Sequence, residues 1–146
     1  MKLGSFKNSA AEYVVKGNNK MLLGDYKAAI LEYTKAIMID PLFPHSYTRR
    51  GAAKMELHDY EGVIQDCLQA LKLHFSAEVE AEKKAMLKGF KKTADYNSTY
   101  SKIYSLIGTA KLLLGKKEEA IVDLNSARLL GNEDAYDILK TYSKEI

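Results

Sequence analysis

The chain lacks several features that would place it in common classes of protein. A single cysteine excludes an internal disulfide, and the only prolines are Pro41 and Pro44, which we expect between helices. No apolar run reaches the roughly 18 residues of a membrane-spanning helix, and the first residues lack the apolar stretch of a signal peptide. We therefore expect a cytoplasmic protein that does not enter a membrane.

The charge and the histidine content argue against two further classes. The 22 Lys and Arg residues against 19 Asp and Glu residues give a net charge of +3, without the concentrated basic stripe typical of nucleic-acid binding. The three histidines, His45, His58 and His74, are not spaced as zinc ligands, and there is no glycine-rich phosphate loop or nucleophile elbow. We therefore predict no catalytic residue, no metal site, no cofactor and no nucleic-acid partner.

What the chain does contain is enough apolar sequence for one packed domain. Its 146 residues are 47% apolar and 28% charged, which is typical of a folded globular protein. A chain of this length buries about two thirds of its unfolded surface. We expect a single domain over residues 1–146.

A pattern of aromatic, small and turn-forming residues recurs after 34 positions. The matching pairs are Tyr13 with Tyr47, Gly17 with Gly51, Asp25 with Asp59, Tyr26 with Tyr60, Ile30 with Ile64, and Ala36 with Ala70. A third copy follows at a shift of 57, which is 34 plus an insertion of 23, and it comprises Tyr104, Gly108, Ala120, Leu124 and Ala127. Each copy predicts two antiparallel helices, because the small residues let the backbones approach and the aromatic side chains fill the space beside them.

This pattern resembles the tetratricopeptide repeat, whose 34-residue unit is a helix, a turn and a helix. The first copy carries the residues characteristic of that family in order: Tyr13, Gly17, Tyr26, Ala29, Tyr33, Ala36 and Pro41. The later copies depart from it at Phe75, which replaces a proline, at Cys67, expected to be a buried packing residue, and at Lys117, which replaces a tyrosine. The resemblance implies an all-α, right-handed solenoid of three helix pairs, in about 8–43, 44–75 and 101–132.

Two segments fall outside the repeats. Residues 76–100 form the insertion, where apolar and lysine residues occupy different faces of a predicted amphipathic helix; these are Val79, Met86, Phe90 and Ala94 against Lys84, Lys88, Lys91 and Lys92. The lysine face is expected to be solvated, or else to dock an acidic partner. Residues 133–146 place Ala135, Ile138, Leu139 and Tyr142 on one face, which predicts a capping helix over the last repeat.

The family resemblance also implies a binding surface. In tetratricopeptide proteins the first helix of each pair lines a concave groove that binds peptides. The positions implied here are Val14, Asn18, Met21, Leu22, Thr48, Arg49, Met55, Lys102, Leu106, Thr109 and Leu112. They make a groove that is partly apolar and partly cationic, which favours a protein or peptide partner with acidic and apolar residues.

One subset of the family binds the C-terminal carboxylates of chaperones through a clamp of five residues. Asn18 and Lys102 match that clamp, while Val14 replaces a lysine, Arg49 replaces an asparagine and Leu106 replaces an arginine. The resemblance therefore implies a non-enzymatic adaptor, similar to the co-chaperones. The alternative is a self-assembly module whose repeats are structural and which forms a homo-oligomer, and an enzyme would require a catalytic domain outside this sequence.

Overall fold

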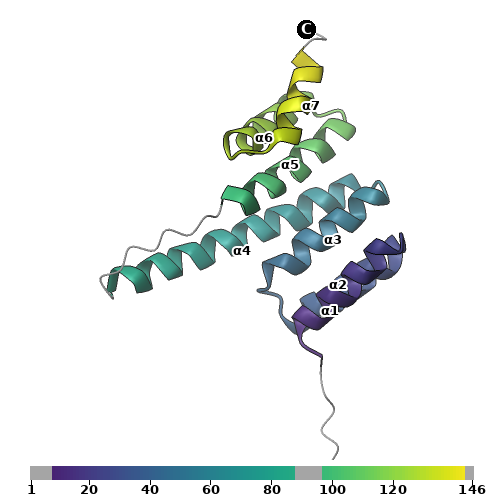
Figure 1. The fold of residues 1–146 in the computed structure, drawn as a ribbon, viewed down its shortest axis with the longest axis vertical. Coiled ribbons are helices and arrows are strands. Elements are labelled where there is room, and N and C mark those ends of the chain that lie inside the picture. Colours follow the sequence, from purple (N-terminus) through teal and green to yellow (C-terminus); the bar gives the residue numbers. More distant parts are fainter. Residues whose placement is uncertain (1–7, 88–96, 144–146) are drawn as a thin grey trace, which may run out of the picture.

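The computed structural model describes residues 8–87 and 97–143, and within these ranges it contains helices and turns but no strand. The prediction of an all-α fold is confirmed. The helices are α1 (Ala10–Leu22), α2 (Tyr26–Ile39), α3 (Pro44–Glu56), α4 (Tyr60–Leu87), α5 (Asn97–Leu113), α6 (Lys117–Leu129) and α7 (Glu133–Ser143). Figure 1 shows them stacked along the long axis of the molecule, from α1 at one end to α7 at the other.

The helices begin where polar side chains can satisfy their free backbone N–H groups. The hydroxyl of Ser9 accepts from the backbone of Glu12 at the start of α1, and the carboxylate of Asp25 accepts from Ala28 at the start of α2. The third helix instead starts with Pro44, whose missing N–H group costs nothing in the first turn. These features mark where α1, α2 and α3 begin.

Three turns within the helix pairs share one backbone conformation. Gly24, His58 and Gly115 occupy the same position of the repeat, and their φ angles are 72°, 61° and 79°. A left-handed residue after a helix lets the following N–H groups bond back to its last carbonyls, as Asp25 does to Lys20 and Asp59 does to Lys54. His58 adopts this angle although it carries a side chain, and its Nδ1 lies 2.8 Å from the hydroxyl of Tyr60.

Close packing within the helix pairs depends on glycine and alanine at the helix contacts. Helix α1 packs on α2, α3 on α4 and α5 on α6, and each pair then packs on the next. Gly17 lies directly against the wholly buried ring of Tyr33, and five alanines of the second helices are 0% exposed; these are Ala29, Ala36, Ala70, Ala120 and Ala127. The repeat residues recognised in the sequence therefore lie where two helices approach each other.

The apolar residues form three successive cores. The first joins α1, α2 and Ala53 of α3, the central one joins α3, α4 and α5, and the last joins α5, α6 and α7 around Leu124, Ala127 and Ala135. The central core spans the boundary that carries the insertion. The insertion therefore does not separate the helices on either side of it.

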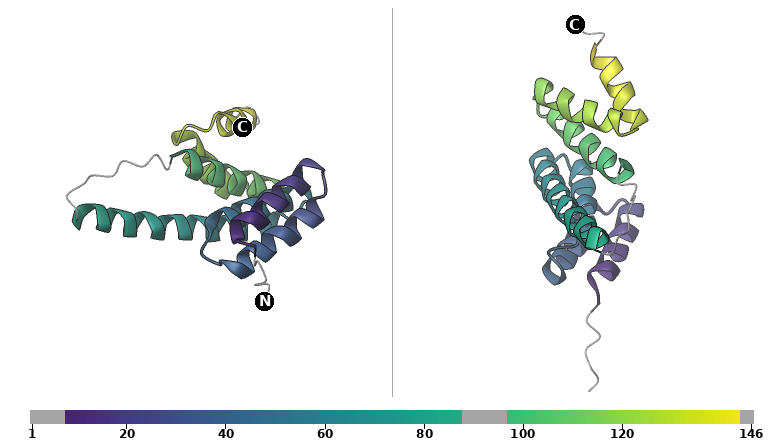
Figure 2. Two further views of the ribbon diagram at one scale, coloured as in Figure 1. Left: turned by 60° about the horizontal axis from the view of Figure 1, so that its bottom comes forward. Right: turned by 90° about the vertical axis from the view of Figure 1, so that its left-hand side faces the viewer.

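The insertion begins as an uninterrupted continuation of α4. This helix has 28 residues, and Figures 1 and 2 show its second half extending past α3 and α5. The rest of the predicted amphipathic helix, with Lys88, Phe90, Lys91, Lys92 and Ala94, lies outside the described residues. No helix in the described ranges is both long and apolar enough to cross a membrane.

Candidate functional site

Two neighbouring hollows lie along α1, α3 and α5. The first, of about 250 Å³, is lined by Asn18, Met21, Leu22, Tyr33, Arg49 and Ala52. The second, of about 260 Å³, is lined by His45, Thr48, Arg49, Ala52, His74, Thr99, Lys102 and Leu106. Because Arg49 and Ala52 line both, the two hollows form one surface, which we call the groove.

The groove brings together residues of three different helices that the family resemblance had selected. These are Asn18, Met21 and Leu22 of α1, Thr48 and Arg49 of α3, and Lys102 and Leu106 of α5. The first helices of successive pairs lie side by side in the stack, so residues far apart in the sequence can line one surface.

Four other selected residues line neither hollow, and three of them pack against neighbouring helices instead. Val14, which we expected in the groove, instead packs in the first core and is only 8% exposed. Met55 packs against the central core and Leu112 against the last one, while Thr109 is half-buried. The two large apolar side chains that we expected to hold a ligand there contribute to the stability of the stack instead.

The first hollow presents hydrogen-bond donors in a fixed arrangement. The hydroxyl of Tyr33 donates to Oδ1 of Asn18 over 2.8 Å, which leaves the Nδ2 hydrogens of Asn18 for a ligand. The pKa of Tyr33 is raised by burial, and the nearby positive charge of Arg49 opposes that shift. Amide and guanidinium donors beside one another suit a carboxylate, which accepts several hydrogen bonds.

The second hollow combines permanent cations with two histidines. The rings of His45 and His74 are 5.7 Å apart between centroids, and Arg49 and Lys102 line the same space. The pKa of His74 is lowered mainly by burial and further by the charge of His45, while the charge of Glu78 on α4 opposes both effects. Among the residues that the structure describes, no carboxylate lines this hollow, so its charge favours an anionic ligand.

Behind the groove, a buried carboxylate anchors α3, and sequence reasoning missed it. Asp66 of α4, 6% exposed, accepts from Nε and Nη2 of Arg50 over 2.9 and 2.7 Å and from Nζ of Lys54 over 2.9 Å. The Nη1 group of Arg50 also donates to Thr34 of α2 over 3.2 Å. These contacts hold the helix that carries Arg49 against both of its neighbours.

The signal for this network was present in the repeat. Lys54 and Asp66 recur at the shift of 57 as Lys111 and Asp123, which form an ion pair of 2.8 Å between α5 and α6. A lysine and an aspartate twelve residues apart, on consecutive helices of a pair, could therefore have been predicted to meet.

The described residues offer little for catalysis or metal binding. No three His, Cys, Asp or Glu side chains within residues 8–87 and 97–143 gather as metal ligands. The single thiol, Cys67, is wholly buried, and burial raises its pKa to about 12, so that it stays protonated at neutral pH.

Comparison with known proteins agrees with this geometry. A sequence model of the tetratricopeptide repeat matches residues 13–41. The first tetratricopeptide domain of Spaghetti (RPAP3), bound to the HSP90 peptide SRMEEVD, superposes with a TM-score of 0.72 and 29% identity over 94% of each chain. Residues 13–41 thus carry a tetratricopeptide repeat, and the fold of the chain is that of tetratricopeptide domains.

Two further tetratricopeptide proteins extend the comparison. The second such domain of human RPAP3, in complex with the HSP70 peptide SGPTIEEVD, gives a TM-score of 0.68 and 27% identity over 91% of this chain and 97% of that one. The small glutamine-rich tetratricopeptide repeat-containing protein 2 of Saccharomyces cerevisiae is 26% identical over 134 residues, which are 92% of this chain and 32% of the relative. The chain thus spans about a third of that relative's length.

Proposed function

We propose that this chain is a non-enzymatic adaptor that binds an acidic peptide, by its terminal carboxylate and the acids before it, in the groove. The observation that carries the proposal is the convergence of Asn18, Arg49 and Lys102 from three helices onto a surface whose described lining residues include no carboxylate. Two similar domains are bound to peptides that end in EEVD. That partner chemistry matches the charge of the groove.

The proposal assigns a central role to Arg49. Leu106 replaces an arginine of the chaperone-binding subset, and the groove loses one guanidinium there. Arg49 lines both hollows and brings a guanidinium to a position where the subset has an asparagine. We infer that this arginine supplies the bidentate carboxylate contact that a leucine cannot make.

Replacing Arg49 by alanine is expected to weaken binding of the peptide SGPTIEEVD by about 1–3 kcal/mol, because a charge-assisted hydrogen bond is lost. Arg49 is exposed, so the free energy of unfolding should stay the same. Isothermal titration calorimetry measures the affinity, and urea unfolding checks the fold. Lys27→Ala, which removes an exposed cation of α2 outside the groove, is the matched control.

The same titration with a C-terminally amidated peptide tests the carboxylate itself. Amidation should weaken binding to the unmodified protein more than it weakens binding to the Arg49→Ala variant, because the two changes remove the same contact. If Arg49→Ala, Lys102→Ala and added salt all left the affinity unchanged, the groove would not be the binding site.

Binding of the acidic peptide is also expected to tighten as the pH falls from about 7.5 to about 5.5, where histidines gain charge. His74 faces His45 and Arg49 of α3 and Lys102 of α5 across the second hollow. In the free protein its pKa lies below the ordinary 6.5. The unfolded chain therefore binds the proton more readily, and stability falls with pH below that value.

A bound anion should oppose this loss by raising the pKa of His74. Affinity measured at several pH values in the protein and in the His74→Asn variant separates the contribution of this ring. A pH profile that the variant leaves unchanged would show that His74 does not sense the peptide.

A further inference from the structure

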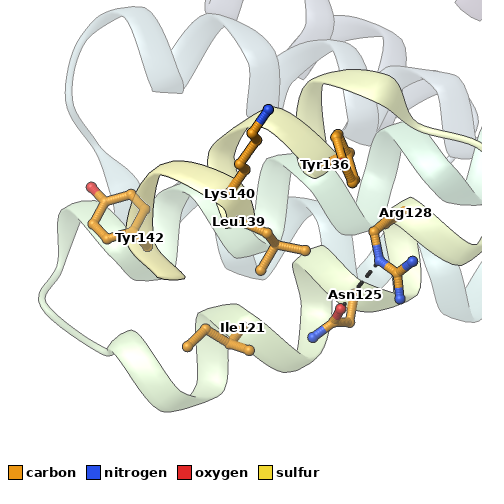
Figure 3. Close-up of a pocket in the computed structure, with 7 residues that line it drawn as sticks. All are labelled: Ile121, Asn125, Arg128, Tyr136, Leu139, Lys140 and Tyr142. Carbon is orange, nitrogen blue, oxygen red and sulfur yellow. Dashed lines mark hydrogen bonds between the residues drawn. The ribbon is translucent and has the colours of Figure 1, made fainter. Parts of the chain in front are cut away.

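A second pocket lies between α6 and α7, away from the groove. It has a volume of about 440 Å³, larger than either hollow of the groove, and shares no lining residue with them. Its lining, drawn in Figure 3, comprises Ile121, Asn125 and Arg128 of α6 and Tyr136, Leu139, Lys140 and Tyr142 of α7. We call it the C-terminal pocket.

The interior of the C-terminal pocket is apolar. Ile121 and Leu139 come from opposite helices and are partly buried, and Leu139 also packs against the last core. Tyr136 lines the pocket with 52% of its surface exposed, so its ring is available to an incoming group. The volume and the lining suit one large aliphatic or aromatic side chain.

The charged residues that the structure describes in the lining of the pocket are basic. Arg128 and Lys140 line it, and Nζ of Lys117 lies 5.8 Å from the centroid of the Tyr142 ring. Nε of Arg128 donates to Asn125 over 3.4 Å, and among the described residues no carboxylate lies within ion-pair distance of its guanidinium. An apolar pocket with a cationic lining is complementary to an acidic partner.

We propose that the C-terminal pocket is a second docking site, which takes one large apolar side chain from an acidic segment of a partner protein. Tyrosine and arginine are the side chains that most often dominate the energy of protein interfaces, and here they surround an apolar interior. The pocket binds independently of the groove, so failure of the peptide-groove proposal would leave this one standing.

The test uses a peptide that cannot supply a terminal carboxylate. The probe is N-acetylated, C-terminally amidated Glu-Glu-Leu-Phe-Glu-Glu, titrated into the isotopically labelled protein while backbone amide chemical shifts are followed by NMR. Saturable shifts are expected in α6 and α7. The reverse-charge peptide, with lysine in place of each glutamate, should produce none.

Variants then locate the contact. The double substitution Arg128→Gln and Lys140→Gln should lower the affinity for the probe roughly five- to tenfold, as expected for the loss of two partly exposed ion pairs. The matched control, Lys27→Gln with Lys84→Gln, removes two exposed cations elsewhere and should leave the affinity unchanged. Tyr136→Ser, at a half-exposed position outside the last core, should weaken binding of the probe because apolar contact is lost.

Three results would overturn the proposal. The probe could change the amide chemical shifts of α1, α3 and α5 only, which would place it in the groove. Its affinity could be the same in the double variant and in the control pair. Finally, the shifts of α6 and α7 could change with protein concentration in the absence of the probe, with a dimer detected by sedimentation, which would make a second copy the occupant.

Discussion

Replacing Asp66 by alanine is expected to lower the free energy of unfolding by about 3–5 kcal/mol, because breaking a buried ion pair leaves uncompensated charges. Asp66 is the shared acceptor for Arg50 and Lys54, whose side chains are only 19% and 17% exposed. Its hydrogen bond is the main cause of the raised pKa of Arg50. Without it, two cations of α3 would face each other with little solvent around them.

Urea unfolding followed by circular dichroism measures this loss. The matched control is Glu80→Gln, which breaks the pair between Lys83 and Glu80, both 65% exposed. An exposed pair of this kind contributes less than about 1 kcal/mol. If the two variants lost the same stability, the Asp66 network would not hold α3 in place.

The second large effect is expected at Gly17. A Cβ at this position would lie 2.6 Å from Cδ1 and 2.8 Å from Cζ of Tyr33, whose ring is wholly buried and whose hydroxyl is held by Asn18. Overpacking of this kind costs about 3 kcal/mol, against a gain of about 1 kcal/mol from the better helix propensity of alanine. Gly17→Ala should therefore destabilise the protein by about 2 kcal/mol.

The equivalent residue of the second repeat provides the contrast. At Gly51 the nearest atom to an added Cβ is Sγ of Cys67 at 3.3 Å, a contact that small shifts can relieve. Gly51→Ala should change stability by less than about 1 kcal/mol in either direction, since helix propensity and crowding nearly cancel. Thermal unfolding of both variants checks the prediction, and equal losses would mean that the aromatic ring is not what excludes a side chain at position 17.

The fold could be predicted from the sequence because the repeat encodes it locally. A glycine or alanine at a helix crossing and a turn signal after each first helix appear at fixed spacing, so the register of Tyr33 against Gly17 follows from the pattern. What the pattern could not give is the continuity of α4. No breaker stands between Val63 and Leu87, and sequence alone does not distinguish one long helix from a helix that restarts.

The groove was predictable only in part, for a reason of geometry. Residues on the first helices were assigned to the groove by their spacing from the small residue, but spacing does not say how far each helix is rotated in the stack. Val14, Met55 and Leu112 face neighbouring helices instead. The C-terminal pocket could not be predicted from the sequence, because it depends on how α7 crosses α6, and α7 belongs to no repeat.

The central core also determines which helices of the stack open first to amide hydrogen exchange. In an array whose units contact only their neighbours, amide hydrogens at the ends exchange with solvent before those in the middle. The largest core joins α3, α4 and α5, so Lys102 lies in the slowly exchanging part, whereas Asn18 lies in the terminal helix α1. A peptide that contacts both residues would tie the end of the chain to its centre and slow exchange throughout α1.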